Sequence, residues 1–138
     1  MSRERDVVIA ARAWLGTPYR HQASVLGAGC DCLGLVRGVW RTLYGDEPMA
    51  LPAYRADMRD AAHAQSLVEA AKRWLIAAPE VGAGRVVLFK LSGAMAPKHC
   101  GIMIAPDRFI HAQEQIGVVE ANLSESWARR VVGAFAFP

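Results

Sequence analysis

The sequence predicts an α+β fold in which helices of the N-terminal half pack on an antiparallel sheet formed by the C-terminal half. Apolar residues recur at helical spacing up to about residue 77, and beyond residue 84 the hydrophobic period becomes that of strands. Helices followed by strands, with short turns between them, are typical of α+β proteins. A chain of 138 residues can bury its own core, so we expect one domain over residues 1–138.

The first helix is expected over residues 3–15. Its apolar side chains recur every three or four positions and therefore share one face, formed by Val7, Ala10, Ala11 and Trp14. Gly16-Thr17-Pro18 ends this helix. Residues 19–29 are predicted to form a loop.

The second helix is predicted over residues 32–44, with Gly45 as its C-terminal cap. A continuous apolar stripe on this helix consists of Leu35, Val36, Val39, Trp40 and Leu43. Such a stripe is typical of a helix packed against a core.

The third helix is expected over residues 59–77, with Pro79 just past its end. Residues 46–57, which contain Pro48 and Pro52, are predicted to be irregular. The buried face of this helix consists of Leu67, Val68, Ala71, Trp74 and Leu75.

About five strands follow the helices. They are short runs rich in Val, Ile and Phe, each bounded by Gly, Pro, Asp or Ser. We expect them over residues 85–91, 98–105, 108–113, 117–121 and 131–137.

Composition excludes several classes of function. The net charge of +3 is mild and the basic residues are scattered, which argues against nucleic-acid binding. No apolar stretch is long enough to cross a bilayer, so membrane insertion is not expected. The N-terminus is charged where a secretory signal needs an apolar segment, so we expect synthesis in the cytoplasm without a signal peptide. Three cysteines do not form a disulfide framework, and free thiols are predicted.

Cys32 lies where a nucleophilic cysteine is favoured. Asp31 is a preferred N-cap residue, so the sequence places the start of the second helix at Cys32. The partial positive charge at a helix N-terminus favours the thiolate, which is the reactive form of the side chain. We therefore identify Cys32 as a candidate nucleophile.

His99 and His111 lie in consecutive predicted strands joined by a turn around Pro106. If residue 106 is the centre of an odd turn, residue 111 stands opposite residue 101, and the two histidines become diagonal neighbours on one face. A two-residue turn without a bulge would place them on opposite faces. The hypothesis therefore requires an odd turn or a bulge near Pro106.

With that register, the three residues form a candidate catalytic triad. His99 would accept the proton of Cys32 and later protonate the leaving amine. His111 would fix the tautomer and orientation of His99. The backbone N–H of Cys32 would stabilise the oxyanion, and Tyr19 and Asp31 are candidate substrate-binding or oxyanion residues.

Structural roles for the same residues remain open at this point. A cysteine at a helix start is often a small buried apolar residue, and a histidine in a strand is often half-buried and structural. A zinc site is conceivable, but neither Cys-x-Cys nor an adjacent His-Cys pair has the ordinary spacing of structural zinc ligands. Its ligands would come from Cys30, Cys32, His99, Cys100 and His111. Cys100 is most simply a core residue.

Four motifs resemble those of the NlpC-type cell-wall peptidases in order and spacing. They are Gly16-Thr17-Pro18-Tyr19, Asp31-Cys32-Leu33-Gly34-Leu35-Val36, His99-Cys100-Gly101-Ile102-Met103-Ile104 and Phe109-Ile110-His111-Ala112. The branch found in phage tails and gene transfer agents is similar in two further stretches. These are Tyr19-Arg20-His21-Gln22 and Gly29-Cys30-Asp31-Cys32-Leu33-Gly34-Leu35.

The resemblance implies a papain-like fold and hydrolysis of peptide bonds in peptidoglycan stems, typically between D-γ-glutamate and diaminopimelate or lysine. The family's nucleophile falls on Cys32, its base on His99, its orienting residue on His111 and its conserved tyrosine on Tyr19. No cofactor or metal is implied.

Three positions depart from the family pattern. Leu33 replaces a usual Ser after the nucleophile, which predicts a less polar cleft. Gly84-Arg85-Val86 stands where Gly-Asp-Leu is typical, and Cys100 replaces a common Val. The first two departures bear on substrate preference.

The resemblance also implies carriage on a phage-like tail, with tail-tip or hub proteins as partners and action at the cell wall. Because the catalytic domain occupies the whole chain, we expect no wall-binding module. Two alternatives are a catalytically silent tail-tip protein with this fold and a related papain-like hydrolase such as a muramoyl amidase. Trp127, Arg129 and Arg130 are interpreted as ordinary exposed surface.

Overall fold

The structure, a computed structural model, describes residues 3–47, 61–90 and 97–138. Its helices are α1 (Arg3–Arg12), α2 (Cys32–Tyr44), α3 (Ala61–Trp74) and α4 (Glu125–Ala128). Its strands are β1 (Ser24–Val25), β2 (Gly29–Cys30), β3 (Ile76–Ala78), β4 (Val86–Phe89), β5 (His99–Ala105), β6 (Arg108–Gln113), β7 (Gly117–Asn122) and β8 (Val131–Ala136). The predicted α+β fold, helices first and strands after, is confirmed.

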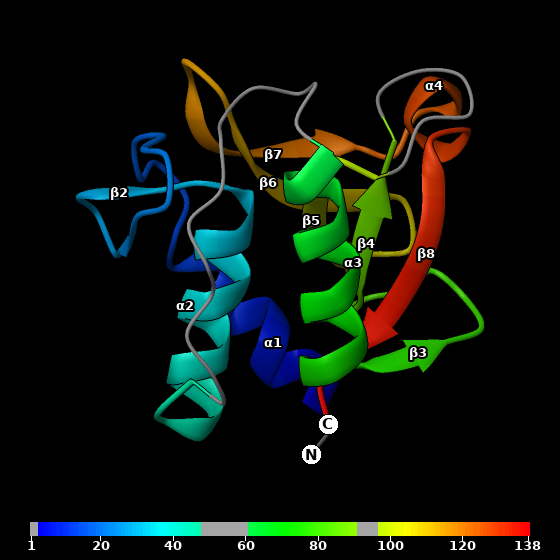
Figure 1. Ribbon diagram of the computed structural model, residues 1–138, viewed down its shortest axis with the longest axis horizontal. Coiled ribbons are helices and arrows are strands. Elements are labelled where there is room, and N and C mark those ends of the chain that lie inside the picture. Colours follow the sequence, from blue (N-terminus) through cyan, green and yellow to red (C-terminus); the bar gives the residue numbers. More distant parts are fainter. Residues whose placement is uncertain (1–2, 48–60, 91–96) are drawn as a thin grey trace.

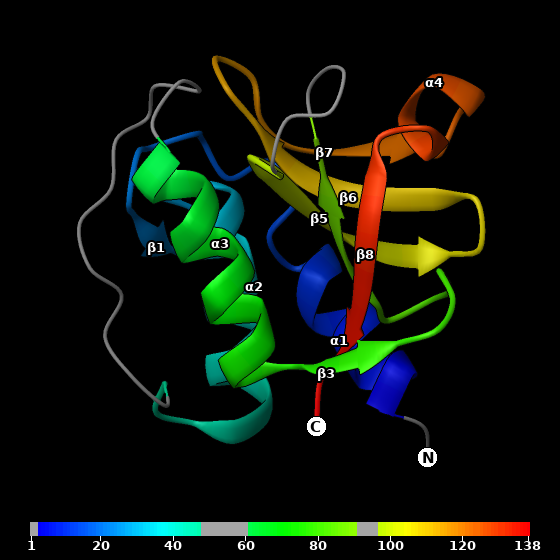
Figure 2. The ribbon, with the colours of Figure 1, turned by 45° about the vertical axis from the view of Figure 1, so that its right-hand side comes forward.

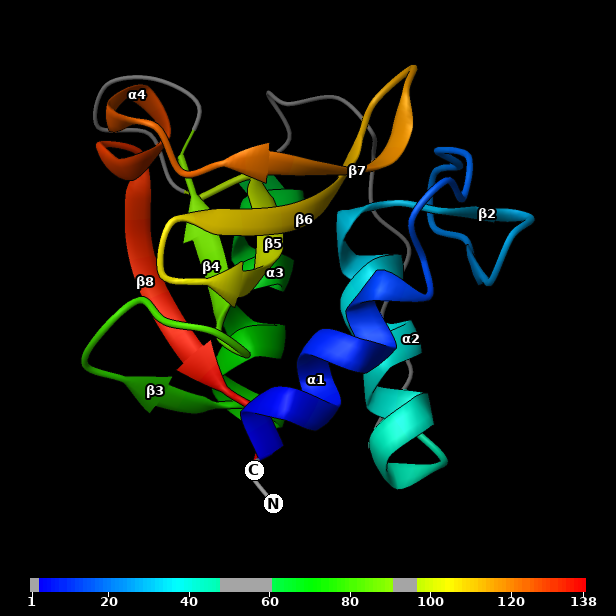
Figure 3. The ribbon, with the colours of Figure 1, turned by 180° about the vertical axis from the view of Figure 1, so that it is seen from behind.

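Six strands form one antiparallel sheet in the order β3-β8-β4-β5-β6-β7. The C-terminal strand β8 lies between β3 and β4, so the end of the chain is built into the sheet (Figure 1). A separate two-stranded ribbon, β1 with β2, precedes α2 and projects to one side of the molecule (Figure 3).

The central strands bury both faces of the sheet. On one face, alternate side chains of β4, β5 and β6 pack against helices α1, α2 and α3, which lie on that side in Figure 2. The intervening side chains form a second, smaller cluster on the opposite face, made of Val87, Phe89, Met103 and Phe109. Because side chains alternate across a strand, adjacent residues of β5 belong to different layers of the molecule.

Helix α2 is the centre of the helical layer, and its start and end agree with the sequence prediction. Gly45 caps its C-terminus with φ 88°, and the Gly45 N–H donates to the carbonyl of Arg41. Leu35, Val36 and Val39 are buried, as the predicted stripe requires. Gly38 faces Trp14, and the indole ring occupies the space that a side chain at residue 38 would fill.

The structure corrects three predictions. Residues 76 and 77, expected at the end of the third helix, begin β3, because Ile76–Ala78 pair with Ala134–Ala136 of β8. Tertiary pairing here overrides a sequence with no strand period of its own. Residues 24–25 and 29 of the predicted loop, with Cys30 after it, form the β1–β2 ribbon. The sheet thus has six strands instead of about five, and helix α4 was not anticipated.

Some predictions lie outside the described residues. They are the irregular stretch from residue 48 to 57, the expected start of the third helix at residues 59–60, and the end of the first strand at residue 91. Within the described ranges, no helix has the length and apolar character needed to span a membrane.

We expect Gly38→Ala to destabilise the protein. The new methyl group would lie 1.9 Å from Cζ2 of Trp14, which is 3% exposed and has no room to move away. Overpacking of this kind costs about 1–3 kcal/mol, enough to exceed the gain of up to about 1 kcal/mol that alanine brings to a helix. Urea unfolding of both proteins measures the difference. Gly82→Ala is the control, because nothing lies within 4 Å of its added methyl group; equal stability of the two variants would contradict the prediction.

Candidate active site

The N-terminus of α2 is fixed by the carboxylate of Asp31. Oδ1 accepts a hydrogen bond of 2.7 Å from the Gly34 N–H, the N-cap contact that the sequence predicted. Oδ2 accepts a second bond of 2.7 Å from the N–H of Gln22, in the loop before the ribbon. The side chain is buried. One carboxylate therefore joins the preceding loop to the helix start at which Cys32 lies.

Gly34 allows the loop to come this close. A side chain at residue 34 would meet the carbonyl oxygen of Ala23 at 1.9 Å, so only glycine fits beneath the loop backbone. The hydroxyl of Ser24 donates to the Gly34 carbonyl at 2.6 Å. The first turn of α2 and the loop at residues 22–24 are thus in direct backbone contact.

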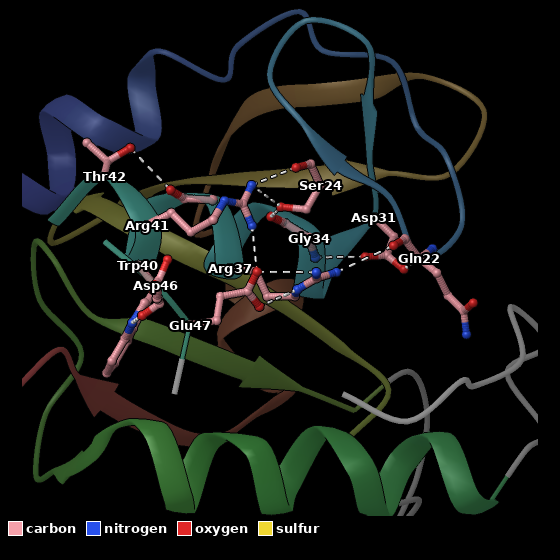
Figure 4. A network of polar contacts seen from close by, with 11 residues as sticks. Gln22, Ser24, Asp31, Gly34, Arg37, Trp40, Arg41, Thr42, Asp46 and Glu47 are labelled. Atoms are coloured by element: carbon pink, nitrogen blue, oxygen red, sulfur yellow. Dashed lines mark hydrogen bonds and ion pairs between the residues drawn. The ribbon is translucent and has the colours of Figure 1, made fainter. Parts of the chain in front are cut away.

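Two arginines of α2 hold the same loop from outside (Figure 4). Arg41 donates to the backbone carbonyl and hydroxyl of Ser24 at 2.6 and 2.8 Å. Arg37 donates to the Gln22 carbonyl at 3.4 Å, and both guanidinium groups bind the carboxylate of Glu47. Burial alone would raise the pKa of Glu47, but the hydrogen bonds from Arg37 and Arg41 lower it. The loop that leads to Cys32 is therefore braced on two sides.

His99 and His111 are in contact, as predicted. Nε2 of His99 lies 2.8 Å from Nδ1 of His111, and both side chains are buried. His99 is the first residue of β5, and His111 lies within the neighbouring strand β6. The contact joins the two ring nitrogens in a single hydrogen bond, whose donor depends on the tautomers.

The contact depends on a bulge in β5. Ile102 pairs with Ile110 and Met103 with Phe109, but Ala105 pairs with Arg108, so the register shifts by one residue between Met103 and Ala105. The turn itself is short, and the extra residue gives the register that places position 101 opposite position 111. The bulge that the sequence hypothesis required is confirmed.

Gly101 completes this arrangement. A side chain at residue 101 would meet the ring of Phe109 at 2.9 Å and Cβ of His111 at 3.4 Å. Because Gly101 lies between the two histidines on the same face of β5 and β6, its small size leaves room for their rings to meet.

The histidine pair lies in an aromatic cluster on the face of the sheet opposite the helices. The ring of Trp127 is 5.4 Å from that of His111 and 6.1 Å from that of His99, and Phe89 and Phe109 border the same group. Trp127 was expected to be exposed surface, which is wrong. Its side chain is half-buried, because helix α4, capped by Ser124, packs the indole against the second core cluster. Arg129 is exposed, and the Arg130 guanidinium lies 5.3 Å from the Trp127 ring centre.

Burial first, and then the neighbouring charge on His99, lower the pKa of His111 to about 4. At neutral pH His111 is therefore an uncharged imidazole. A neutral ring can accept a hydrogen bond at Nδ1 from a protonated His99.

Cys32 lies at the start of α2, against the first residues of β5. The thiol of Cys100, the residue after His99, donates to the Cys32 carbonyl at 3.3 Å. Tyr19, which forms a bridge with Cys30, is half-buried on the other side. Burial raises the pKa of the Tyr19 hydroxyl and the charge on Cys32 raises it further, so this group stays a hydrogen-bond donor near the thiol.

The candidate residues thus fall into two groups, linked through Cys100, which follows His99 in β5 and contacts the Cys32 carbonyl. The structure brings His99 and His111 together on one side, and Cys32, Tyr19, Asp31 and Cys100 on the other. Cys100 is fully buried in the main core, as predicted. The catalytic roles of Cys32, His99 and His111, and the substrate-binding or oxyanion roles of Tyr19 and Asp31, stay predictions.

Two departures from the family pattern have clear positions. Leu33 is buried and lines a small apolar pocket between α2, α3 and the sheet, together with Val36 and Leu67. Arg85 lies beside Glu4 of α1, with 3.7 Å between the charged groups. No group of three His, Cys, Asp or Glu side chains within the described ranges is arranged to hold a metal ion.

Solved structures with this architecture support the fold assignment. An NLP/P60 family protein of Staphylococcus aureus, described as similar to a lipoprotein, superimposes with a TM-score of 0.63 at 22% identity, over 98% of this chain and 41% of that one. An NlpC/P60 family protein of Bacillus cereus gives 0.67 at 18% identity, over 97% and 40%. The NlpC/p60 domain of the peptidoglycan hydrolase SagA gives 0.62 at 20% identity, over 97% and 98%.

These likenesses establish the papain-like fold shared with NlpC/P60 domains. The chain spans about two fifths of the length of the first two proteins and almost the whole of the third domain. No curated protein shows significant sequence similarity to the chain. The sequence model of the NlpC/P60 family matches residues 16–136, a range that includes Tyr19, Cys32, His99 and His111. The chain therefore belongs to the NlpC/P60 family.

Proposed function

We propose that this protein is a cysteine peptidase that hydrolyses peptidoglycan stem peptides. The hydrogen bond between His99 and His111 is the observation on which the proposal mainly rests. Two buried histidines in a single hydrogen bond, one of them neutral, supply a base and a residue that orients it. Family membership and the position of Cys32 at a capped helix N-terminus support the same reading.

We assign different roles to the two ring nitrogens of His99. Nε2 is engaged with His111, so Nδ1 is the atom that would accept the proton of Cys32. The resulting thiolate attacks the carbonyl carbon of the substrate, and the protonated His99 then donates its proton to the leaving amine. His111 accepts the Nε2–H of His99 and so stabilises the imidazolium form.

The start of α2 would stabilise the tetrahedral intermediate. The backbone N–H of Cys32 and the Tyr19 hydroxyl are the donors that we assign to the oxyanion. Asp31 positions the start of the helix by joining the loop at Gln22 to the first helical turn at Gly34. Its buried carboxylate only accepts hydrogen bonds, so we assign it this positioning role.

We further propose that the scissile bond joins D-γ-glutamate to diaminopimelate, and that a phage-like tail delivers the protein to the cell wall. The bond is supported by the resemblance of motifs within residues 16–36 and 99–112 to the NlpC-type cell-wall peptidases. Delivery is supported by the resemblance of residues 19–22 and 29–35 to the branch found in phage tails and gene transfer agents. Mass spectrometry of purified particles tests delivery: the protein should co-purify with tail-tip or hub proteins, and its absence from such particles would refute that part.

Digestion of purified muropeptides tests the activity. We expect the native protein to cleave glutamyl–diaminopimelate bonds and Cys32→Ala to lose this activity by a factor of at least about 10⁴, because the thiolate is the nucleophile. Mass spectrometry of the products identifies the bond. Cys30→Ala is the matched control and should retain activity, since Cys30 is a buried thiol outside the proposed triad.

Other outcomes of the digestion would indicate a different function. Cleavage at the lactyl–alanine bond would identify a muramoyl amidase. A folded native protein that cleaves no muropeptide and binds tail proteins stably would be a structural tail component, and the peptidase proposal would be wrong.

The low pKa of His111 predicts a specific loss of stability in acid. The ordinary pKa of 6.5 applies to the unfolded chain, and the folded value is about 4. Between these values the unfolded chain binds more protons, so the free energy of unfolding falls as the pH drops from about 6.5 to about 4, by up to about 3 kcal/mol. Above pH 6.5 this contribution is fully present.

His111→Gln should remove most of that pH dependence, because the amide does not titrate, and should retain part of the activity by holding His99 with a neutral side chain. Urea unfolding between pH 4 and 8 measures the first effect and muropeptide digestion the second. The native protein, unfolded at the same pH values, is the reference. An unchanged pH profile in His111→Gln would show that another group causes the acid sensitivity.

A further inference from the structure

Three cysteines gather at the start of α2, although the proposed mechanism uses only one of them. Cys30 precedes the helix in β2, Cys32 begins it, and Cys100 lies in β5 against it. All three are buried, and none of these described residues forms a disulfide. Buried thiols beside a nucleophilic cysteine have chemistry of their own when an oxidant reaches the site.

Cys100 is in direct contact with Cys32. Its sulfur lies 3.3 Å from the carbonyl oxygen of Cys32, so the Cys100 side chain points at the residue that bears the proposed nucleophile. Cys100 belongs to the helix face of the sheet, whereas His99 belongs to the opposite face. A thiol at position 100 therefore approaches Cys32 without displacing the histidine pair.

We propose that Cys100 is the resolving cysteine of a reversible redox modification at Cys32, in which a Cys32–Cys100 disulfide forms and protects the nucleophile from irreversible oxidation. The inference rests on the proposed function insofar as it treats Cys32 as the reactive thiol. The oxidant is a hydroperoxide, and the reductant that reverses the step is a low-molecular-weight or protein thiol.

The reaction balances in two steps. The thiolate of Cys32 attacks one peroxide oxygen, an S–O bond forms, the O–O bond breaks, and the departing hydroxide takes a proton to become water. The Cys100 sulfur then attacks the sulfenic sulfur, an S–S bond forms, the S–O bond breaks, and a second water leaves with the Cys100 proton. Both sulfurs are oxidised and the peroxide is reduced to water.

The surroundings of Cys100 explain why Cys32 is oxidised first and Cys100 reacts second. The hydrogen bond with the Cys32 side chain, then burial, then the charge on Cys32 raise the pKa of Cys100 well above its ordinary value. Cys100 thus stays a neutral, poorly nucleophilic thiol as long as the Cys32 side chain carries a negative charge. Oxidation of Cys32 removes its negative charge and changes that hydrogen bond, so Cys100 ionises more readily when it is needed.

Cys30 is a poorer partner. It lies in β2, where its N–H donates to the Pro18 carbonyl and its backbone bridges Tyr19. Burial first, and then the charges on Asp31 and Cys32, raise the pKa of its thiol to about 12. A Cys30–Cys32 link would also have to close across one residue at the start of α2, against the backbone contacts that fix the loop.

Peptide mapping after treatment with hydrogen peroxide tests the proposal. In the native protein we expect the peptides that contain Cys32 and Cys100 to be joined, with the loss of two hydrogens, and to separate on reduction with dithiothreitol. Muropeptide hydrolysis should be lost on oxidation and return to the untreated level on reduction.

The matched variant is Cys100→Val, which keeps an apolar side chain of similar size in the core. Before oxidation it should hydrolyse muropeptides like the native protein, and after oxidation it should stay inactive on reduction, with Cys32 recovered as sulfinic acid. Cys30→Ala should behave like the native protein. Thermal unfolding of each variant shows that the fold is retained, and Cys100→Ala replaces Cys100→Val if valine unfolds the core.

The outcomes separate this inference from the proposed function. If the native protein hydrolyses muropeptides but no Cys32–Cys100 peptide forms, or if Cys100→Val recovers on reduction as well as the native protein does, the inference is overturned. If the disulfide forms in a protein without hydrolase activity, the inference stands and the proposed function fails.

Discussion

The bulge in β5 is the constraint on which the candidate site depends. A strand side chain points to one face or the other, and a shift of one residue in register exchanges the faces. The extra residue between Met103 and Ala105 places the side chains of residues 99 and 111 on the same face of the sheet, where they form a hydrogen bond of 2.8 Å. Without it the two rings would lie in different layers of the protein.

The site also requires that the start of α2, which bears Cys32, is held in place. The buried carboxylate of Asp31 holds it by accepting hydrogen bonds from the loop at Gln22 and from the helix at Gly34. Arg37 and Arg41 brace the loop from the side of α2, with Glu47 between their charges (Figure 4). Hydrogen bonds of this kind place Cys32 more firmly than packing alone, because each is directional and at least partly buried.

The three positions that depart from the family pattern lie at different places relative to Cys32. Leu33 faces the apolar pocket between the helices and the sheet, and Arg85 lies beside Glu4. Both are turned toward the framework of the protein in this structure. Cys100, the third of these positions, contacts the Cys32 backbone directly. A change that is nearly neutral for core packing thus alters the chemistry available at the proposed nucleophile.

Much of this protein was determined by local sequence. Periodicity and caps gave the bounds of α2, because the Asp31 side chain and the left-handed conformation of Gly45 act within one helical turn. Strands β5 to β8 were predicted within one or two residues, because turn residues bound each of them. The pairing of His99 with His111 was predicted as a condition, since sequence spacing alone does not distinguish a bulge from a regular turn.

Tertiary structure decided those features that depend on contacts between residues distant in the sequence. Ile76–Ala78 became a strand because β8 offers an edge for pairing, and no local signal opposes the helix predicted there. Trp127 joins the aromatic cluster because α4 folds over the second face of the sheet. The indole is therefore half-buried, although the neighbouring residues in the sequence are exposed. The contact between Cys100 and Cys32 likewise joins residues far apart in sequence. Sequence thus determined the elements and the chemical groups, and the packing of the sheet decided which of those groups meet, because side-chain contacts across layers depend on register and docking.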